Sequence, residues 1–485
     1  MNEILFGSSD PQEAYKISKM LHEKKIRKIA PRIYSANFEE TPAEIIKRNI
    51  LVILGNLYPG AVLSHRSAFE FKPTGTNQIF VTYKYTRKVY LPGVTINFLK
   101  GKGHVDGDNK LFGELYVSSK ERAFLENLHI TKKVGPDSHS LSIPQLEEKL
   151  DDILSINGED GLNSIRDKAR NLSAVLDMPR QFERFNKIIG ALFTTRPSKI
   201  LKSDLAISHA AGLPYDKERI KIFGILFDYL HNHEFKDHPE NYLIPNSFRN
   251  FSFFEAYFSN YIEGIVFEVS EAKKIIDTGI PLMDRKDDSH DVLGTYQIVS
   301  NKNEMKIIPK NGDEFLGLLQ SRHKSLLSAR IDKHPGEFKS QNNRAGNTSF
   351  VDFKLVRGTL TRGFEYYKAL TNSFACAAYI MFLVSEVHPF EDGNGRIARI
   401  MMNAELGSRS QYKIIIPSVF QEDYLLTLKK LTNDKAPVPY VEMLTKAHAF
   451  SKNLHFENYA DLYNYLNVHN AFYEPNEGKH LIVDN

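Results

Sequence analysis

The 485-residue sequence has one cysteine, no tryptophan, and no apolar run near the about 20 residues of a membrane span. The single thiol, Cys376, excludes an intrachain disulfide framework and a cysteine-rich zinc site. Its neighbours Phe374, Ala375, Ala377 and Ala378 predict a buried small hydrophobe and no nucleophile. No basic segment followed by an apolar one marks a signal peptide at the N-terminus. We therefore expect a cytoplasmic protein with no membrane partner.

Charge is unevenly distributed along the chain. Residues 1–100 hold 15 Lys and Arg against 8 Asp and Glu, a net of +7, so the rest sums to −3 within a total of +4. The hydrophobic share of 42% and the charged share of 25% are ordinary for a globular chain of two to four domains. A basic first fifth points to an acidic partner for that part.

Periodicity predicts a mainly α protein in which only the first part mixes helices with strands. The expected parts are an α+β region at 1–125, a helical connection at 139–240, a helical region at 245–320, a core at 321–450 and a tail at 451–485. Within them we expect a strand at 78–85 and a long helix from Phe251 to Ile276. The tail predicts no function.

The residues with chemical potential lie between 364 and 405. An apolar stretch of helical length, 364–387, predicts one buried helix that ends before Pro389. Gly393 and Gly395 then form a loop, and a helical pattern resumes at Arg396. A loop with glycines can turn successive N–H groups toward one anion, and the helix that follows adds its positive end.

Other side chains around this loop suit the same ligand. Arg396 and Arg399 carry guanidinium groups that match phosphate oxygens. Asp392 offers a hard oxygen for Mg²⁺, and His388 can accept a proton at neutral pH. A base, a metal ligand, an anion cradle and two arginines thus fall within twelve residues, where a solvated loop would need none of them.

The segment from His388 to Arg399, His-Pro-Phe-Glu-Asp-Gly-Asn-Gly-Arg-Ile-Ala-Arg, resembles the motif of the Fic family at every defined position. The resemblance implies a helical Fic domain with a β-hairpin flap over about 321–445. It also implies transfer of AMP from ATP to a Ser, Thr or Tyr hydroxyl of a target protein. Relatives that transfer a phosphoryl group have lysine where this chain has Gly395, so AMP transfer is favoured.

The resemblance also assigns roles. His388 would be the general base that frees the target oxygen to attack the α-phosphorus, and Asp392 would hold Mg²⁺ against the phosphates. The amides of Gly393, Asn394 and Gly395 would stabilise the phosphate charge. Arg396 and Arg399 would bind the β- and γ-phosphates, while Phe390 would anchor the loop in the core.

Two neighbouring segments extend the resemblance. Residues 336–347 and 348–355 form a Gly- and Asn-rich turn between strand-forming residues, like the Fic flap, although a surface hairpin would look the same. The family's flap arginine is here Lys339. Downstream, Tyr424 resembles a tyrosine near the adenosine, and Asn433 stands nearest to a displaced asparagine; a core tyrosine is the alternative.

Ser259, Glu263 and Gly264 match the Fic inhibitory motif, Ser-x-x-x-Glu-Gly, and precede the core as in the class with an N-terminal brake. The resemblance implies that Glu263 pairs with Arg399 and holds ATP in an unproductive pose. It also allows a reverse reaction in which this glutamate positions water to remove AMP. Without the motif, Glu263 would be a solvated helix position.

The basic N-terminal part resembles the beginning of AbiEi-type antitoxin regulators, which carry a winged-helix-like DNA-binding module. The resemblance rests on residues 27–34, Arg-Lys-Ile-Ala-Pro-Arg-Ile-Tyr, and on 60–68, Gly-Ala-Val-Leu-Ser-His-Arg-Ser-Ala. Lysines and arginines along a helix could neutralise DNA phosphates, but a solvated basic face explains them equally well.

Three functions therefore compete. The first is a self-inhibited protein adenylyltransferase. The second is a DNA-binding, antitoxin-like regulator in which the Fic part senses a nucleotide, and the third is phosphoryl transfer. A cluster of His231, His233, Glu234 and His238 could hold a metal but lacks the spacing of a metal site, so a solvated turn is favoured.

Overall fold

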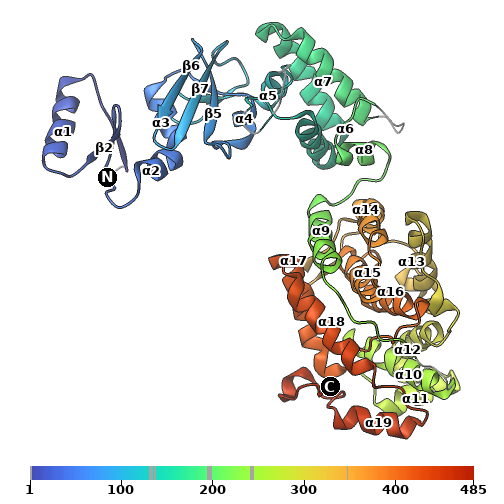
Figure 1. Ribbon diagram of the computed structural model, residues 1–485. Coiled ribbons are helices and arrows are strands. Elements are labelled where there is room, and N and C mark those ends of the chain that lie inside the picture. Colours follow the sequence, from blue (N-terminus) through green and yellow to red (C-terminus); the bar gives the residue numbers. More distant parts are fainter. Residues whose placement is uncertain are drawn as a thin grey trace. The chain divides into compact units, whose positions relative to one another are not determined.

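The computed structural model describes residues 3–129, 135, 138–193, 199–240, 245–346 and 348–484. It divides into two compact units, Met1–Gly212 and Leu213–Asn485. Helices dominate, and strands are concentrated in the first unit, which confirms a mainly α fold with a mixed N-terminal region (Figure 1). None of the described helices is long and apolar enough to cross a membrane.

The first unit begins with a small sheet and continues with a larger one. The small sheet has the order β1-β3-β2, and the larger one the order β6-β7-β5-β4-β9-β8. The elements are β1 (Ile4–Phe6), α1 (Pro11–His22), β2 (Arg27–Ala30), β3 (Ile33–Ser35), α2 (Pro42–Arg48), α3 (Ile50–Leu57), β4 (Val62–Leu63), α4 (Arg66–Glu70), β5 (Gln78–Tyr83), β6 (Arg87–Leu91), β7 (Val94–Lys100), β8 (Asn109–Lys110) and β9 (Tyr116–Val117).

Four helices complete the first unit: α5 (Lys120–Asn127), α6 (Ile143–Leu176), α7 (Pro179–Leu192) and α8 (Asp204–Ala210). In α6 the chain kinks at Gly158, whose φ of 68° is left-handed. Gly158 thus interrupts the regular helical backbone of this long helix. The helices enclose a core of their own, distinct from the apolar cluster around the larger sheet.

The second unit is almost entirely helical. Its elements are α9 (Lys217–His231), α10 (Pro245–Ile262), α11 (Val269–Thr278), η1 (Met283–Arg285), α12 (Lys286–Val299), η2 (Glu304–Lys306), α13 (Gly312–Leu326), η3 (Ile331–Lys333), β10 (Arg344–Ala345), β11 (Thr348–Ser349), η4 (Phe353–Leu355), α14 (Val356–Lys368), α15 (Ser373–Val387), α16 (Asn394–Ser408), η5 (Ser418–Phe420), α17 (Gln421–Asp434), α18 (Pro437–Ser451), α19 (Tyr459–Val468) and η6 (Pro475–Glu477).

Helix α15 lies among the other helices of the second unit (Figure 1). It is buried on nearly every side, and Cys376 is one of its buried residues. It packs along α16, and other helices of the unit surround the pair. A helix that is apolar all round needs such a position. The loop between the two helices, residues 388–393, is therefore held at both ends by tightly packed helices.

Two expected helices are each divided in two. The stretch 364–387 is shared between α14 and α15, because the Asn372 side chain accepts the Ala375 N–H at 3.1 Å and starts a new helix. The pattern from Phe251 to Ile276 is shared between α10 and α11. Gly264, with φ of 84°, follows the end of α10, and Glu268 and Glu271 form a capping box at the start of α11.

Candidate functional site

His388 lies at the end of α15, where its backbone is left-handed with φ of 53°. The ring stacks on Phe350 with centroids 3.7 Å apart, and its Nδ1 lies 3.4 Å from the carbonyl oxygen of Ser385. Because a carbonyl only accepts, Nδ1 carries the hydrogen and Nε2 keeps its lone pair. Burial lowers the pKa of His388 to about 4, so the ring is neutral at neutral pH.

The loop after His388 is held by its own motif residues. The fully buried Phe390 donates its N–H to the Asn394 side-chain oxygen at 2.8 Å and accepts from the Asn394 amide at 2.9 Å. Phe390 thus anchors the loop in the core, as the sequence predicted. Asn394, buried and doubly engaged, closes the turn into α16.

His323, on α13, supports the same loop. Its ring stacks on Phe390 with centroids 3.8 Å apart, and its Nδ1 accepts the Gly336 N–H at 2.9 Å. Nε2 must then carry the hydrogen, which it donates to the backbone oxygen of Asp392 at 3.1 Å. Burial lowers the pKa of His323 to about 4 and keeps this arrangement neutral. Sequence reasoning missed His323 because nothing in its neighbourhood resembles a site.

The start of α16 is built to receive an anion. Gly393 precedes the helix with φ of 73°, so the N–H groups of the first turn lie at the helix's positive end. Asp392 accepts the Gly393 N–H at 2.6 Å, and its side chain is 39% exposed, which leaves carboxylate oxygen free for a cation from solvent. The described residues bring together no group of three metal-ligating side chains, and Asp392 is the carboxylate from which the sequence predicts a metal contact.

Arg399 lies one turn further along α16 and contacts two residues of the Ser-x-x-x-Glu-Gly segment, Ser259 and Glu263. Its Nε donates to the Ser259 hydroxyl at 3.0 Å, and its Nη2 donates to the Ser259 backbone oxygen at 2.8 Å and to Glu263 at 2.7 Å. Nη1 lies 3.5 Å from the Tyr424 hydroxyl. Each of the three guanidinium nitrogens therefore has a polar neighbour. The residue is only 5% exposed, so these protein groups take the place of water around it.

Glu263 itself lies just past the end of α10, so it belongs to a turn and not to the helix expected from the sequence. Its N–H donates to the Asn260 oxygen at 3.0 Å, and Gly264, with φ of 84°, follows. A β-carbon built on Gly395 would lie 2.2 Å from Glu263 Oε1. The glutamate therefore rests on the first turn of α16, and the absence of a side chain at 395 makes that contact possible.

Arg396 takes a different direction. It is 2% exposed and pairs with Asp291 of α12 at 2.6 Å, with Asn260 at 3.5 Å and with Asp392 at 3.4 Å. It does not line the pocket described below, whereas Arg399 does. The phosphate role expected for Arg396 stays a prediction. Asp291 is a second residue that the sequence did not reveal, because its partner lies 105 positions away.

A pocket of about 340 Å³ opens beside these groups. It brings together His388, Gly395, Arg399, Tyr424 and Glu263, which the sequence had singled out from three separate segments. The remaining walls come from the flap and from α15 and α17: Ala345, Gly346, Thr348, Phe350, Ser385, Glu386, Leu425, Leu428, Lys429, Thr432 and Asn433. The mixture of apolar wall and converging polar groups is typical of a small-molecule site.

The flap is a short antiparallel hairpin. Strands β10 and β11 pair Arg344 with Ser349 and Ala345 with Thr348, while Asn347, the last residue of the expected turn, lies outside the described residues. Arg219 of α9 donates to the Ser349 oxygen at 2.7 Å and lies 2.6 Å from Glu386. The hairpin is thereby tied to the end of α15 next to the pocket.

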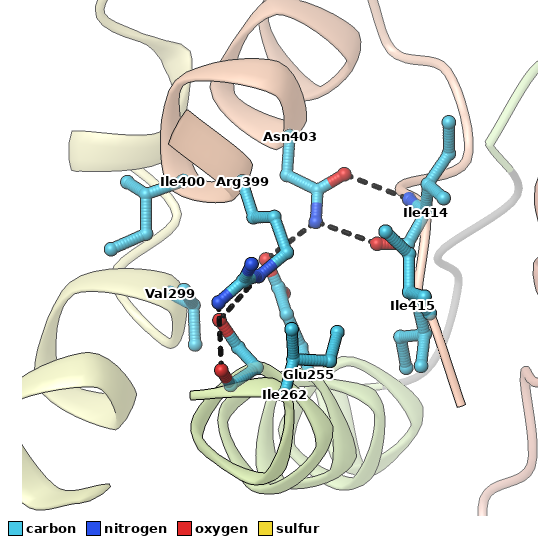
Figure 2. A pocket seen from close by; sticks show the side chains of 10 residues that line it. Glu255, Ile262, Val299, Arg399, Ile400, Asn403, Ile414 and Ile415 are labelled. Atoms are coloured by element: carbon cyan, nitrogen blue, oxygen red, sulfur yellow. Dashed lines mark hydrogen bonds between the residues drawn. The ribbon is translucent and has the colours of Figure 1, made fainter. Parts of the chain in front are cut away.

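Helix α10 is fixed to α16 by a buried polar network (Figure 2). Asn403 donates to Glu255 at 2.8 Å and exchanges two hydrogen bonds of 2.8 Å with the backbone of Ile414. Glu255 also pairs with Lys413. Figure 2 shows Arg399 and Asn403 reaching from one helix toward α10, and their hydrogen bonds to Ser259 and Glu255 tie α10 to α16.

Comparisons with known proteins point to one family. Residues 316–406 match the Fic/DOC family. The chain is 30% identical over 100 residues to a Fido domain-containing protein of Dictyostelium discoideum, which covers 19% of this chain and 69% of that protein. It is 24% identical over 223 residues to the protein adenylyltransferase Fic of Drosophila persimilis, with 43% of this chain and 42% of the relative covered. The chain thus spans less than half the length of that relative.

A solved Fic domain containing signaling protein from Bacteroides thetaiotaomicron is also similar. It is 19% identical, with 50% of this chain and 96% of that chain covered at a TM-score of 0.39.

Proposed function

The chain belongs to the Fic/DOC family, and we propose that it transfers AMP from ATP to a hydroxyl side chain of a target protein. The observation that carries this proposal is the pocket in which the neutral His388 faces the start of α16. Relatives named protein adenylyltransferase support the reaction class. The target and the modified residue type are set by surfaces that this pocket does not define.

His388 is the base in this proposal. Its Nε2 accepts the proton of the target hydroxyl as that oxygen bonds to the α-phosphorus and the bond to pyrophosphate breaks. The hydrogen on Nδ1 stays with the Ser385 oxygen, so the resulting imidazolium keeps a partner. The N–H groups of Asn394 and Gly395 receive the negative charge that grows on the phosphate oxygens, joined by that of Gly393 if it leaves the Asp392 carboxylate.

The residues present fit a magnesium ion. Asp392 is partly exposed in the loop just before α16, and Mg²⁺ commonly takes one or two carboxylates, with waters and substrate phosphates as its other ligands. When bound, the ion would neutralise charge on the phosphates. Asp392 is kept in position by His323 through its backbone and by Arg396 through its side chain.

Self-inhibition by Glu263 is part of the proposal. Its carboxylate lies against the guanidinium of Arg399 and above Gly395, where a terminal phosphate would meet the helix end. A fixed negative charge there competes with the phosphate for the same cation. Release of the inhibition would require Glu263 to move away from Arg399. The reverse reaction would instead require Glu263 to stay near the pocket and position a water molecule.

The experiment that tests AMP transfer uses the full chain with Glu263→Gly, in parallel with α- and γ-labelled ATP. Label from α-labelled ATP should appear on protein, with a mass increase of one AMP, and should fall by about 10²–10⁴ in the variant that also has His388→Ala. Label retained from γ-labelled ATP alone would replace the proposal with phosphoryl transfer. Labelling that does not change in the His388 variant would remove His388 as the base.

A second function, DNA binding by the first unit, is favoured by one specific observation. In the part with strand order β1-β3-β2, basic side chains of α1, of β2 and of the β2–β3 turn are exposed. These exposed residues include Lys16, Lys19, Lys28 and Arg32. The AbiEi-like resemblance remains a prediction, tested by binding of the full chain to DNA from upstream of its own coding region. Sequence-specific binding that persists at moderate salt supports it, and binding erased by salt counts against it.

A further inference from the structure

The pocket beside His388 has two ends, and helix α17 runs from one to the other. At the first end the hydroxyl of Tyr424 lies 3.5 Å from Nη1 of Arg399. At the second end the hydroxyl of Thr432 lies 2.6 Å from Oε2 of Glu386. Tyr424 and Thr432 both line the pocket and are eight residues apart on α17, so the helix rises about 12 Å between the two ends. A nucleoside triphosphate whose phosphates meet Arg399 therefore has its base near Glu386.

The base end of the pocket combines apolar surface with one carboxylate. Among the described residues that line the pocket, Glu263 and Glu386 carry carboxylates, and Glu263 lies at the phosphate end against Arg399. Glu386 is only 5% exposed, and Leu428 of α17 supplies apolar wall beside it. Because little water reaches such a carboxylate, a ligand group that does not match it as a hydrogen-bond partner remains unsatisfied. Glu386 can therefore discriminate between bases.

Glu386 is held from two sides by other helices. Its Oε1 lies 2.6 Å from Nη1 of Arg219 on α9, and that arginine also donates to the Ser349 oxygen of the flap at 2.7 Å. The Thr432 hydroxyl, at Oε2, is also 3.0 Å from the Leu428 oxygen. Burial raises the pKa of Glu386, while Arg219 acts in the opposite direction and favours the charged form. Each carboxylate oxygen has one protein neighbour, and each has a second lone pair for a ligand.

We propose that Glu386, held by Arg219 and Thr432, selects the base of the nucleotide by accepting a hydrogen bond from an amino group of that base. The inference rests on the proposed function, in which a nucleoside triphosphate occupies this pocket. An ionised carboxylate only accepts, so it suits the 6-amino group of adenine and repels the carbonyl oxygen that guanine has at the same position. Glu386 thereby favours ATP over GTP and acts on binding, while the transfer step belongs to the other end of the pocket.

The experiment compares nucleotides that differ at the 6-position of the purine. The parent is the full chain with Glu263→Gly, which leaves the phosphate end open. Calorimetry measures its affinity for ATP, for purine ribonucleoside triphosphate, which has hydrogen in place of the amino group, and for ITP, which has a carbonyl there. The added variants are Glu386→Gln, Asn433→Ala at a neighbouring amide of the pocket, and Glu365→Gln as a control at an exposed glutamate of α14.

The parent should bind ATP about tenfold to a hundredfold more tightly than the nucleotide without the amino group, and should bind ITP more weakly still. In Glu386→Gln the preference for ATP over ITP should fall by at least about tenfold, because an amide can either accept from an amino group or donate to a carbonyl. Glu365→Gln should keep the ratios of the parent.

Two results would overturn the inference in a folded Glu386→Gln chain: a preference for ATP over ITP equal to that of the parent, or a preference that only Asn433→Ala removes. If Glu386→Gln does not fold, the parent still decides, because equal affinity for the three nucleotides means that nothing in the pocket recognises the amino group.

Failure of the proposed function has a different signature. Transfer of label from α-labelled ATP to protein is measured in the same chains. If no chain transfers label while the preference for ATP depends on Glu386, AMP transfer is wrong and base selection stands. If label is transferred but the preference does not depend on Glu386, base selection is wrong and AMP transfer stands. Binding of no nucleotide by any chain overturns both.

Discussion

The carboxylate of Glu263 lies 2.7 Å from the guanidinium of Arg399, across 136 positions of sequence. The same guanidinium has further bonds to Ser259, so α10 presents both a hydroxyl and a carboxylate to one buried cation. Burial by itself lowers the pKa of Arg399, but Glu263 and Tyr424 leave it raised. The guanidinium is thus charged and committed to α10 as the structure stands, and a phosphate would have to displace Glu263 to bind it.

Replacement of Glu263 by glycine should increase AMP transfer by at least about tenfold, since the loss of a buried charge contact of this kind is worth more than about 1.4 kcal/mol. Ser259 would remain as a partner of Arg399, so the fold should persist. The measurement is self-labelling with α-labelled ATP, together with circular dichroism.

Glu263→Gln serves as the matched control for this change. It keeps the shape and removes the charge, so it should fall between the parent and Glu263→Gly. Equal labelling in all three chains would mean that Glu263 does not restrain the enzyme.

Gly395→Ala should loosen the same contact from the other side. Its Cβ would lie 2.2 Å from Glu263 Oε1 and 3.1 Å from Arg399 Nη1, and both atoms end flexible side chains that can shift without unfolding. Affinity for ATP should rise in the otherwise native chain. In a Glu263→Gly background the methyl group has no carboxylate to displace, so the gain should vanish. Calorimetric titration of ATP into the parent, Gly395→Ala, Glu263→Gly and the double variant measures this. If Gly395→Ala raises the ATP affinity equally in both backgrounds, the contact between residue 395 and Glu263 does not limit ATP binding.

The sequence was most informative where the chemistry is local. The segment from His388 to Arg399 is one loop and one helix, and its local spacing brings His388, Gly395 and Arg399 to the same pocket. The mainly α fold also followed from periodicity. The helices expected at 364–387 and 251–276 were wrong in extent. Asn372 caps the start of a new helix within the first, left-handed Gly264 follows the end of α10 within the second, and apolar patterns continue across such breaks.

Contacts between distant segments could not be predicted in the same way. Asp291 and His323 have no unusual sequence neighbours, and only the packing of α12 and α13 against α16 gives them partners. Likewise, Arg396 and Arg399 are equivalent in a motif but differ in the fold: one meets Asp291 and the other lines the pocket. Two side chains three residues apart on a helix point in somewhat different directions, and the packing around the helix decides which of them reaches the ligand pocket.

Acid should destabilise the protein through its buried histidines. Burial lowers the pKa of His448 to about 4, below the ordinary 6.5 that it regains on unfolding. The unfolded chain therefore binds the extra proton between these values, so stability is complete above pH 6.5 and is lost as pH falls toward 4. His448→Gln should remove up to about 3 kcal/mol of that pH dependence. Urea unfolding between pH 4.5 and 7.5 measures it, with the exposed His334→Gln as control.

Removal of the Asp291 carboxylate tests whether Arg396 is part of the scaffold. Asp291 is 2% exposed, lies 2.6 Å from Arg396 and is also 3.5 Å from Arg330. Burial raises the pKa of Asp291, and Arg396 acts in the opposite direction. The carboxylate is shielded from water, so its charge is stabilised mainly by the guanidinium of Arg396. Asp291→Ala leaves a buried guanidinium without its closest anion and should cost about 3–5 kcal/mol in urea unfolding.

The comparison with Arg396→Met then separates scaffold from ligand binding. The double variant Asp291→Ala/Arg396→Met removes both charges and should recover most of the stability lost in Asp291→Ala, because two apolar groups can replace a buried ion pair at little cost. If Arg396 serves the scaffold, the double variant should bind ATP with nearly the affinity of the parent. A large loss of ATP affinity in a stably folded double variant would instead make Arg396 a phosphate ligand that must leave Asp291 when the nucleotide enters.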